Sequence, residues 1–351
     1  MKINLKRNEV SLLYDLIDQK EKNIFVADLL LDLINSKSAS KNKDINTVYD
    51  LAASYLDEED KVELKANLNN KIDLLDINKY LDNPYNKNIQ IKEVKYKDYL
   101  LSYETLKANE IFISDEININ ENNNYLETTS LAYFTKDYKY LTLIKDNVIW
   151  MSINPNEINT MDEDIKSMHG NILVLGLGLG YISYMLSLKD DVNSITIIEK
   201  DKEIINLFNK YLLNNFKFKN KIKIIHQDAL NYLKNNHLDS YQFVYVDLYH
   251  NPNDGLKLFL DIKKIESKYS STKFLYWLNK SLFSLVRRVL LTLLIEVYEG
   301  SSIKDYQNEV YETDFLLNKL FRYFENTSIT SIKEIYQLIT TANIDKIIKD
   351  L

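Results

Sequence analysis

The first eighty residues carry apolar side chains at the spacing of helices. Apolar positions recur every three or four residues over 12–17 and again over 25–33, which places them on one face of a helix. Polar stretches at 36–43 and 67–71 interrupt this pattern, and Pro84 ends it, because the residue before a proline disfavours helical angles. We expect a bundle of four or five helices and assign residues 1–88 to an N-terminal helical domain.

Between residues 89 and 153 the pattern changes to short runs of β-branched and aromatic residues. Such runs, at 89–94, 131–134, 141–144 and 148–153, are typical of strands. The polar stretch 120–124 predicts a loop between them. We therefore expect a small, mostly antiparallel β-rich domain over 89–153. Trp150, in its last run, and Trp277, further along the chain, are expected to lie in the core.

After residue 170 short apolar runs alternate with helical segments. The runs are 171–175, 194–199, 221–226, 242–247 and 273–277. Strands that are nearly continuously apolar and separated by helices indicate a parallel sheet covered on both faces. The fold class is therefore α/β, with a doubly wound, mostly parallel sheet over 154–300. Beyond it, the spacing in 301–351 predicts a helical C-terminal extension.

Glycine is scarce in this chain, and its placement is informative. At an average usage of about 7%, roughly 25 glycines are expected; the 351 residues contain 6. Three of them, Gly176, Gly178 and Gly180, alternate directly after the run 171–175. Because glycine allows positive φ and a close approach of backbone to ligand, this turn is the first candidate binding site. A tight strand–helix connection without a ligand is the alternative.

Charge and cysteine content exclude several functions. The absence of cysteine rules out disulfides and thiolate metal sites. A net charge of −7 argues against a broad surface for nucleic acid. The N-terminus lacks the apolar core of a signal peptide, and the longest apolar stretch, 282–297, contains Arg287, Arg288 and Glu296. We expect a cytoplasmic protein with no membrane or nucleic-acid partner and, since its histidines are scattered, no metal site.

Acidic residues follow the predicted strands. Glu199 ends the second strand, 23 residues after Gly176; in dinucleotide folds an acid ~20 residues on takes the ribose hydroxyls. Tyr181 stands where the dinucleotide motif needs a small residue, which argues against that ligand. Asp228 follows the third strand and Asp247 the fourth. Because the carboxyl ends of parallel strands meet at one edge, these acids are expected to share one crevice.

Residues 170–277 resemble class I S-adenosylmethionine-dependent methyltransferases, and within them the spermidine synthase-like branch. The resemblance is carried by LVLGLGLGY, the acid of TIIEKD, the DAL of IIHQDAL and the aspartate of FVYVDLYH. It implies a Rossmann-like class I methyltransferase fold that binds S-adenosyl-L-methionine. In this resemblance the site residues are Gly176, Gly178 and Gly180 against the methionine part, Glu199 at the ribose, Asp228 with Ala229 at the adenine, and Asp247 at the reaction centre.

Two departures from the spermidine synthase pattern bear on the reaction. Leu179 stands at the acidic position of the GGGDGG turn, and His250 replaces the second acid of the D-S-S-D-P-like run. Two carboxylates attract a diamine far better than Asp247 and an imidazole do. We therefore expect methyl transfer to a small-molecule acceptor. The alternatives are an aminopropyltransferase that uses decarboxylated S-adenosylmethionine, and a non-catalytic S-adenosylmethionine-binding or interaction protein.

The catalytic assignment centres on Asp247 to His250. Asp247 or His250 would take the acceptor proton, since histidine titrates near neutral pH; an ordinary polar loop residue is the alternative for His250. Tyr249 either walls the pocket or packs on the sheet.

The junction before the first strand of the cofactor fold supplies the substrate-binding candidates. By the same resemblance, Asn154 and Glu157 contact the acceptor. Helix capping is the alternative for Asn154, as it is for Asp228. A homodimer is the candidate assembly.

Overall fold

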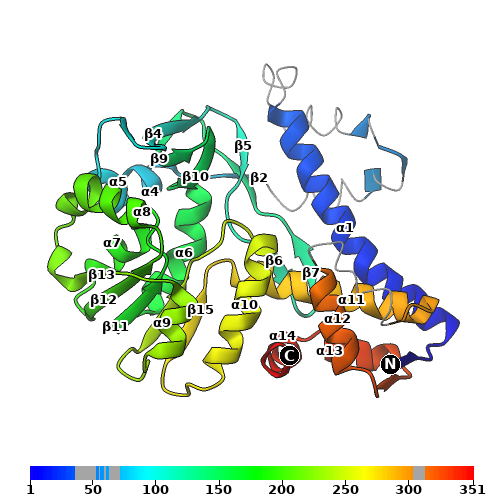
Figure 1. Ribbon diagram of the computed structural model, residues 1–351. Coiled ribbons are helices and arrows are strands. Elements are labelled where there is room, and N and C mark those ends of the chain that lie inside the picture. The colour runs from blue at the N-terminus through cyan, green and yellow to red at the C-terminus, as the bar shows by residue number, and fades with distance from the viewer. Residues whose placement is uncertain (36–52, 55, 59–60, 63–71, 303–312) are drawn as a thin grey trace.

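The computed structural model describes residues 1–35, 53–54, 56–58, 61–62, 72–302 and 313–351. The expected helical bundle therefore lies partly outside the described residues. Its first member is a single 29-residue helix, α1 (Arg7–Asn35), seen in Figure 1 as the long blue helix. Leu13 and Leu16 of α1 are buried in the main core, and Val26 and Leu30 form a smaller cluster with Ile111. Helical spacing thus predicts this element.

The largest sheet of the described residues has five parallel strands and lies toward the left in Figure 1. Its strand order is β13-β12-β11-β14-β15, and each neighbouring pair is parallel. This order, 3-2-1-4-5 in chain sequence, is that of a doubly wound sheet, with the switch point between β11 and β14. The predicted α/β class is confirmed. The strands are β11 (Gly170–Leu175), β12 (Val192–Glu199), β13 (Ile222–His226), β14 (Phe243–Val246) and β15 (Lys273–Tyr276).

Helices cover both faces of this sheet. Right-handed crossovers place α7 and α8 on one face and α9 and α10 on the other; α6 packs against α7, and α11 against α10. Side chains in the interior of β11, from Ile172 to Leu175, are fully buried, as expected for a strand covered on both sides. The helices are α6 (Pro155–Ser167), α7 (Tyr181–Ser187), α8 (Lys202–Leu207), α9 (Ala229–Asn235), α10 (Pro252–Glu266) and α11 (Asn279–Glu299).

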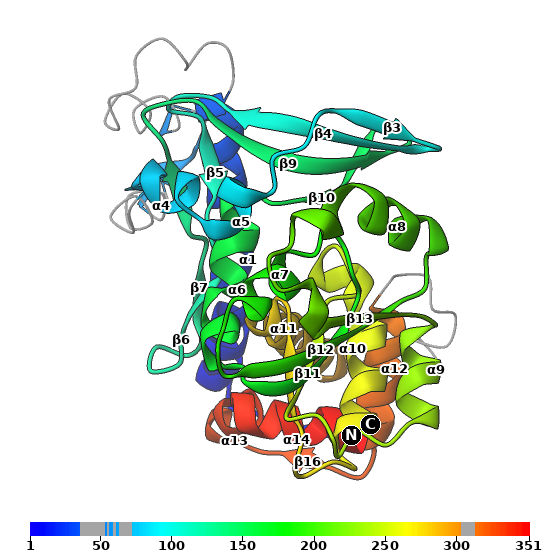
Figure 2. The ribbon, with the colours of Figure 1, turned by 90° about the vertical axis from the view of Figure 1, so that its left-hand side faces the viewer.

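The β-rich segment forms a separate four-stranded sheet, which Figure 2 shows above the parallel one. Its order is β10-β9-β4-β3, and all pairs are antiparallel, as predicted. The run 89–94 is wrong as a strand, because Ile89 caps a helix and pairing starts at Val94. The strands are β3 (Val94–Tyr96), β4 (Tyr99–Leu106), β9 (Tyr138–Lys145) and β10 (Val148–Ser152).

Smaller β elements join this segment to what precedes and follows it. The three-stranded sheet has the order β2-β8-β5, and β6 pairs with β7 in a hairpin around the predicted loop. The β2–β8 pair is parallel, an exception to the antiparallel prediction. The strands are β2 (Ile72–Leu74), β5 (Ile111–Ile113), β6 (Asn118–Asn120), β7 (Leu126–Thr128) and β8 (Leu131–Tyr133).

Residues 72–88 differ from the expected helical bundle. They form β2 and two five-residue helices, α4 (Ile77–Leu81) and α5 (Pro84–Asn88). The side chains of Asp76 and Asn83 cap these helices, which stops the helical pattern from running on. Since β2 pairs with β8 and α5 packs against α7, this stretch joins the β-rich segment to the parallel sheet. The domain boundaries at 88, 153 and 300 stay predictions.

The C-terminal region packs against α10 and α11. It contains α12 (Asp314–Tyr323), β16 (Ser328–Ile329), α13 (Ile332–Leu338) and α14 (Thr341–Asp350). The strand β1 (Lys2–Ile3) pairs in parallel with β16. The segment 282–297 lies within α11 as a buried helix, and Arg287 within it is fully buried. In the described part of the chain, no helix has the length and apolar character needed to cross a bilayer.

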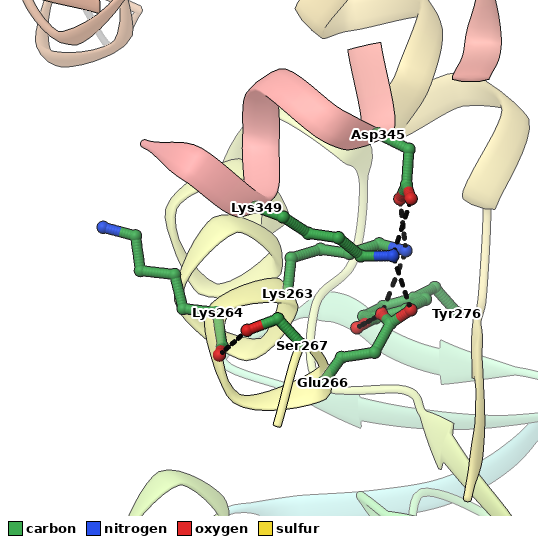
Figure 3. A network of polar contacts seen from close by, with 7 residues as sticks. All are labelled: Lys263, Lys264, Glu266, Ser267, Tyr276, Asp345 and Lys349. Atoms are coloured by element: carbon green, nitrogen blue, oxygen red, sulfur yellow. Dashed lines mark hydrogen bonds and ion pairs between the residues drawn. The ribbon is translucent and has the colours of Figure 1, made fainter. Parts of the chain in front are cut away.

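A polar network joins α14 to α10 (Figure 3). Nζ of Lys263 lies 3.0 Å from carboxylate oxygens of both Glu266 and Asp345. Lys349 pairs with Asp345 at 2.6 Å, and the hydroxyl of Tyr276 donates to Glu266 at 2.7 Å. Although Lys263 is buried, its charge is therefore compensated on both sides, which fixes where the last helix lies.

Candidate functional site

A cavity of about 680 Å³ lies where the strands of the parallel sheet end, between the glycine turn and β10. This size is within the range of small-molecule sites, roughly 300–1,000 Å³. Asn154 is the predicted site residue that does not line it. The predicted residues that do line it are Gly176, Gly178, Gly180, Glu199, Asp228, Ala229, Asp247, Tyr249, His250 and Glu157. Their roles toward a ligand stay predictions.

The glycine turn needs glycine for two different reasons. A Cβ on Gly176 would lie 1.9 Å from the backbone oxygen of Asp247, and its φ is +100°, so this glycine is required by packing within the fold. At Gly178, with φ +53°, the nearest atom to such a Cβ is Sδ of Met151 at 3.5 Å. Gly178 therefore presents bare backbone to the cavity, and Met151 of β10 faces it.

Glu199 is a buried brace for this turn. One carboxylate oxygen accepts from the backbone N–H of Leu177 at 3.1 Å and the other from that of Asp201 at 2.7 Å. Each carboxylate oxygen has a second lone pair that can still accept a hydrogen bond. The acid at the end of β12 therefore has a structural role in addition to the predicted ligand role.

Two predicted residues cap helices. Asp228 accepts from the N–H of Asn231 at 2.9 Å at the start of α9, and it also lines the cavity. Asn154 accepts from the N–H of Glu157 at 3.0 Å and donates to the hydroxyl of Ser152 at 3.0 Å. For Asn154 the capping alternative is confirmed. Because it lies outside the cavity lining, it acts by holding Ser152 and the start of α6.

Asp247 and Glu157 are two carboxyl groups that line the same cavity. Burial, with a smaller contribution from the charge of Glu199, raises the pKa of Asp247 to about 7. Burial is also the main reason why the pKa of Glu157 is raised to about 8; the hydroxyl of Ser152, donating at 2.8 Å, acts against this rise, and the charge of Asp247 adds to it. Among the described residues the side chain of Asp247 has no hydrogen-bond partner. These carboxyl groups can therefore exchange protons near neutral pH or bind a cation.

Tyr249 is held by packing. Its hydroxyl donates to the carbonyl of Trp277 at 2.5 Å, and the two rings stack at 6.1 Å. A Cβ on Gly255 would lie 2.5 Å from the Tyr249 ring, so α10 also presses against it. These contacts favour the packing alternative for Tyr249. Trp277 is buried, as expected.

His250 and Trp150 face one another at the cavity. Their ring centroids are 4.5 Å apart in an edge-to-face arrangement, and Trp150 is 38% exposed. The core position expected for Trp150 is therefore wrong. The reason is a bulge in β10, where the register shifts between Ile149 and Met151, since a bulge re-aims the side chains at its position.

The sequence alone does not identify the β10 residues that line the cavity, or Tyr85, which supports the glycine turn. Ile149, Trp150, Met151 and Ser152 of β10 all line the cavity, but their apolar run reads as an ordinary core strand. From α5, the hydroxyl of Tyr85 donates to the carbonyl of Leu179 in the glycine turn at 2.6 Å. No short-range signal links Tyr85 to a turn 94 residues away.

The described residues contain no group of three or more histidine or acidic side chains arranged to hold a metal ion.

The chain shows little similarity to known proteins. No protein-family model matches the sequence, and no curated protein matches it. Solved structures of spermidine synthases are similar at a low level. The enzyme from Thermotoga maritima matches with a TM-score of 0.30 and 13% identity, over 43% of this chain and 58% of that one. A spermidine synthase in complex with the transition state analogue AdoDATO matches at 0.30 and 15%, over 43% and 60%. Each match spans less than two thirds of the solved chain.

Proposed function

We propose that this chain is a transferase that binds S-adenosyl-L-methionine in the cavity and transfers its methyl group to a small-molecule amine. One observation carries the proposal: the glycine turn and the acids after β12, β13 and β14 line a single cavity at the carboxyl ends of parallel strands. Ligands of open α/β sheets bind at this edge, beside the switch point. The acceptor class follows from the charges of the cavity.

The cavity is strongly acidic. Its lining contains six carboxylic residues and one lysine: Glu157, Glu199, Asp201, Asp228, Asp247, Asp254 and Lys200. In a partly desolvated space such a set favours cations over anions. A sulfonium cofactor and an ammonium acceptor are both cations. Leu177, Leu179 and Tyr181 line the cavity without filling it, which speaks against a blocked, non-catalytic site.

Residues of the chain would act mainly by positioning and by accepting a proton. When bound, S-adenosylmethionine supplies a methyl group on a sulfonium sulfur; the new nitrogen–carbon bond forms as the carbon–sulfur bond breaks and a neutral thioether leaves. Asp247 and Glu157 hold the acceptor nitrogen, and one of them takes its proton. A pKa of about 7 or 8 suits a group that must accept a proton and later return it to solvent.

Aminopropyl transfer is the second candidate, and one observation favours it. Glu157 lines the same cavity as Asp247 and supplies a second carboxylate that the residues after β14 lack. Leu179, apolar and buried in the turn, argues the other way. Preference for decarboxylated S-adenosylmethionine over the intact cofactor would select this candidate.

Calorimetry on the full chain tests the proposal. We expect binding of S-adenosylmethionine and of its demethylated product, S-adenosylhomocysteine. Gly178→Ala should abolish both, because its methyl group projects from the turn into the cavity. Gly300→Ala is the matched control: its φ of +105° imposes similar strain, but no atom lies within 4 Å of the added carbon and the residue does not line the cavity. Failure of the wild-type chain to bind either ligand would overturn the proposal.

A further inference from the structure

Two segments that line the cavity, β10 and the loop after β14, each connect a carboxyl group with an aromatic ring. On β10, the hydroxyl of Ser152 donates to Glu157, and Trp150 lies two residues earlier in the same strand. On the facing loop, Asp247 is followed three residues later by His250, whose ring meets Trp150. The two acids therefore lie at one end of this path, and the two aromatic rings at the other.

The aromatic end is apolar and held in place. Ile149, Trp150 and Leu258 line the cavity together, and Ile149 is 47% exposed. Nζ of Lys145 lies 5.1 Å from the Trp150 ring centroid and donates to the hydroxyl of Tyr99 at 3.2 Å. A cation over one ring face orients the indole. Trp150 is thus presented to the cavity in a defined position.

Two further carboxylates of the cavity lining, those of Asp254 and Asp201, already accept hydrogen bonds from the protein. Asp254 is the nearest acid along the chain, but its two oxygens accept from the N–H groups of His250 and Asn251, at 3.1 and 2.9 Å. Both oxygens of Asp201 are likewise engaged: one accepts from the hydroxyl of Tyr99 at 2.7 Å and the other from backbone N–H groups. Hydrogen bonds thus hold these two carboxylates in place, whereas the side chain of Asp247 has no such partner among the described residues.

We propose that the acceptor is a monoamine with an apolar or aromatic body, and that Trp150 is the residue that selects this body. The ammonium group lies between Glu157 and Asp247, and the body packs against Trp150 and Ile149. This inference rests on the proposed function and narrows its acceptor class. It excludes diamines as preferred acceptors, because the second ammonium would be desolvated against an indole already opposed by Lys145.

The test uses the full chain saturated with S-adenosylhomocysteine, whose own binding is measured first. Four probes are then titrated calorimetrically: phenethylamine, ethylamine, putrescine and 3-phenylpropionate. We expect phenethylamine to bind at least about tenfold more tightly than ethylamine or putrescine, as burial of one ring implies. The carboxylate 3-phenylpropionate should not bind, because the acids repel it.

Three variants separate the two ends of the path. Trp150→Ala should remove the preference for phenethylamine over ethylamine, and Trp150→Phe should retain most of that preference; the affinity of each variant for S-adenosylhomocysteine is measured first. Glu157→Gln should weaken both monoamines alike. Phenethylamine should change the tryptophan emission of the wild-type chain more than that of Trp150→Phe, in which Trp277, also a lining residue, is the remaining tryptophan.

The outcomes are distinct. Tighter binding of putrescine than of phenethylamine, or an unchanged preference in Trp150→Ala, would overturn this inference and leave the proposed function standing. If S-adenosylhomocysteine does not bind, the proposed function fails and the inference fails with it.

Discussion

Glu157 and Asp247 are carboxyl groups that line the cavity, and burial is the main reason why the pKa of each is raised. A folded protein that retains protons its unfolded chain would release becomes less stable as the pH rises. Selection for a reactive cavity can accept such a loss. Burial that raises the pKa of these two groups, as the proposed chemistry requires, therefore also lowers the stability of the fold at higher pH.

Glu157→Gln should accordingly stabilise the chain in a pH-dependent way. The unfolded carboxyl ionises near its ordinary pKa, whereas the folded one holds its proton up to about 8. The loss of stability caused by Glu157 is therefore absent below the pKa of the unfolded chain, grows as the pH rises, and is complete above about pH 8. We expect thermal unfolding midpoints to match wild type near pH 4 and to exceed it near pH 9 by roughly 2 °C, or ~1–2 kcal/mol. Glu163→Gln, an exposed change on α6, is the control; an equal shift at both pH values would contradict the prediction.

The sequence alone places the acids after the parallel strands in the cavity, but it does not place Trp150 there. Glu199, Asp228 and Asp247 each follow an apolar run, and the topology of parallel sheets brings strand ends together. Trp150 stands inside an apolar run too, yet a bulge turns it into the cavity. A bulge depends on how β10 pairs with β9, which one strand alone does not encode.

At the scale of elements, the glycine turn is supported from outside the parallel sheet. Tyr85 of α5 bonds the carbonyl of Leu179, and Asn83 bonds the hydroxyl of Tyr181 at 3.0 Å. All five parallel strands are visible in the sequence because their apolar runs are long and regularly spaced. The pieces at 72–88 are not, because β2 pairs with β8 across nearly sixty residues and the two helices are each five residues long.

Tyr85→Phe should therefore weaken the fold and the site together. It leaves the buried carbonyl of Leu179 without its donor, which costs ~1–2 kcal/mol, and it loosens the turn. We expect lower stability in urea and weaker binding of S-adenosylhomocysteine. Tyr96→Phe is the matched control, since no described residue bonds that hydroxyl. Equal behaviour of the two variants in both measurements would show that the contact is dispensable.

At the scale of the whole molecule, the C-terminal helix is fixed by charges from distant parts of the chain. Apolar residues at helical spacing predict helices in 335–348, and Ile344, Ile347 and Ile348 of α14 are buried. Where α14 docks is not visible in the sequence. The pair Lys263–Asp345 spans 82 residues, and the rings of Phe259, Tyr276 and Phe283 surround Lys263 within 5.7 Å.

Lys263→Met tests this anchor. Methionine keeps much of the buried volume but leaves Glu266 and Asp345 with Lys349 as their cationic partner among the described residues, so we expect a loss of about 1–3 kcal/mol in urea unfolding. The neighbouring side chain of Lys264 points away from the network in Figure 3. Lys264→Met should stay within about 0.5 kcal/mol of wild type. A smaller effect at Lys263 than at Lys264 would refute the anchoring role.

The residues that line the cavity come from two different sheets, so the two walls can change independently during evolution. The glycine turn, Glu199, Asp228 and Asp247 lie at the ends of strands of the parallel sheet, whereas Trp150, Met151 and Ser152 belong to the edge strand of the antiparallel one. Substitutions in that edge strand alter one wall and leave the hydrogen bonds of the other intact. Descendants of this chain could therefore acquire new acceptors by changing β10 alone.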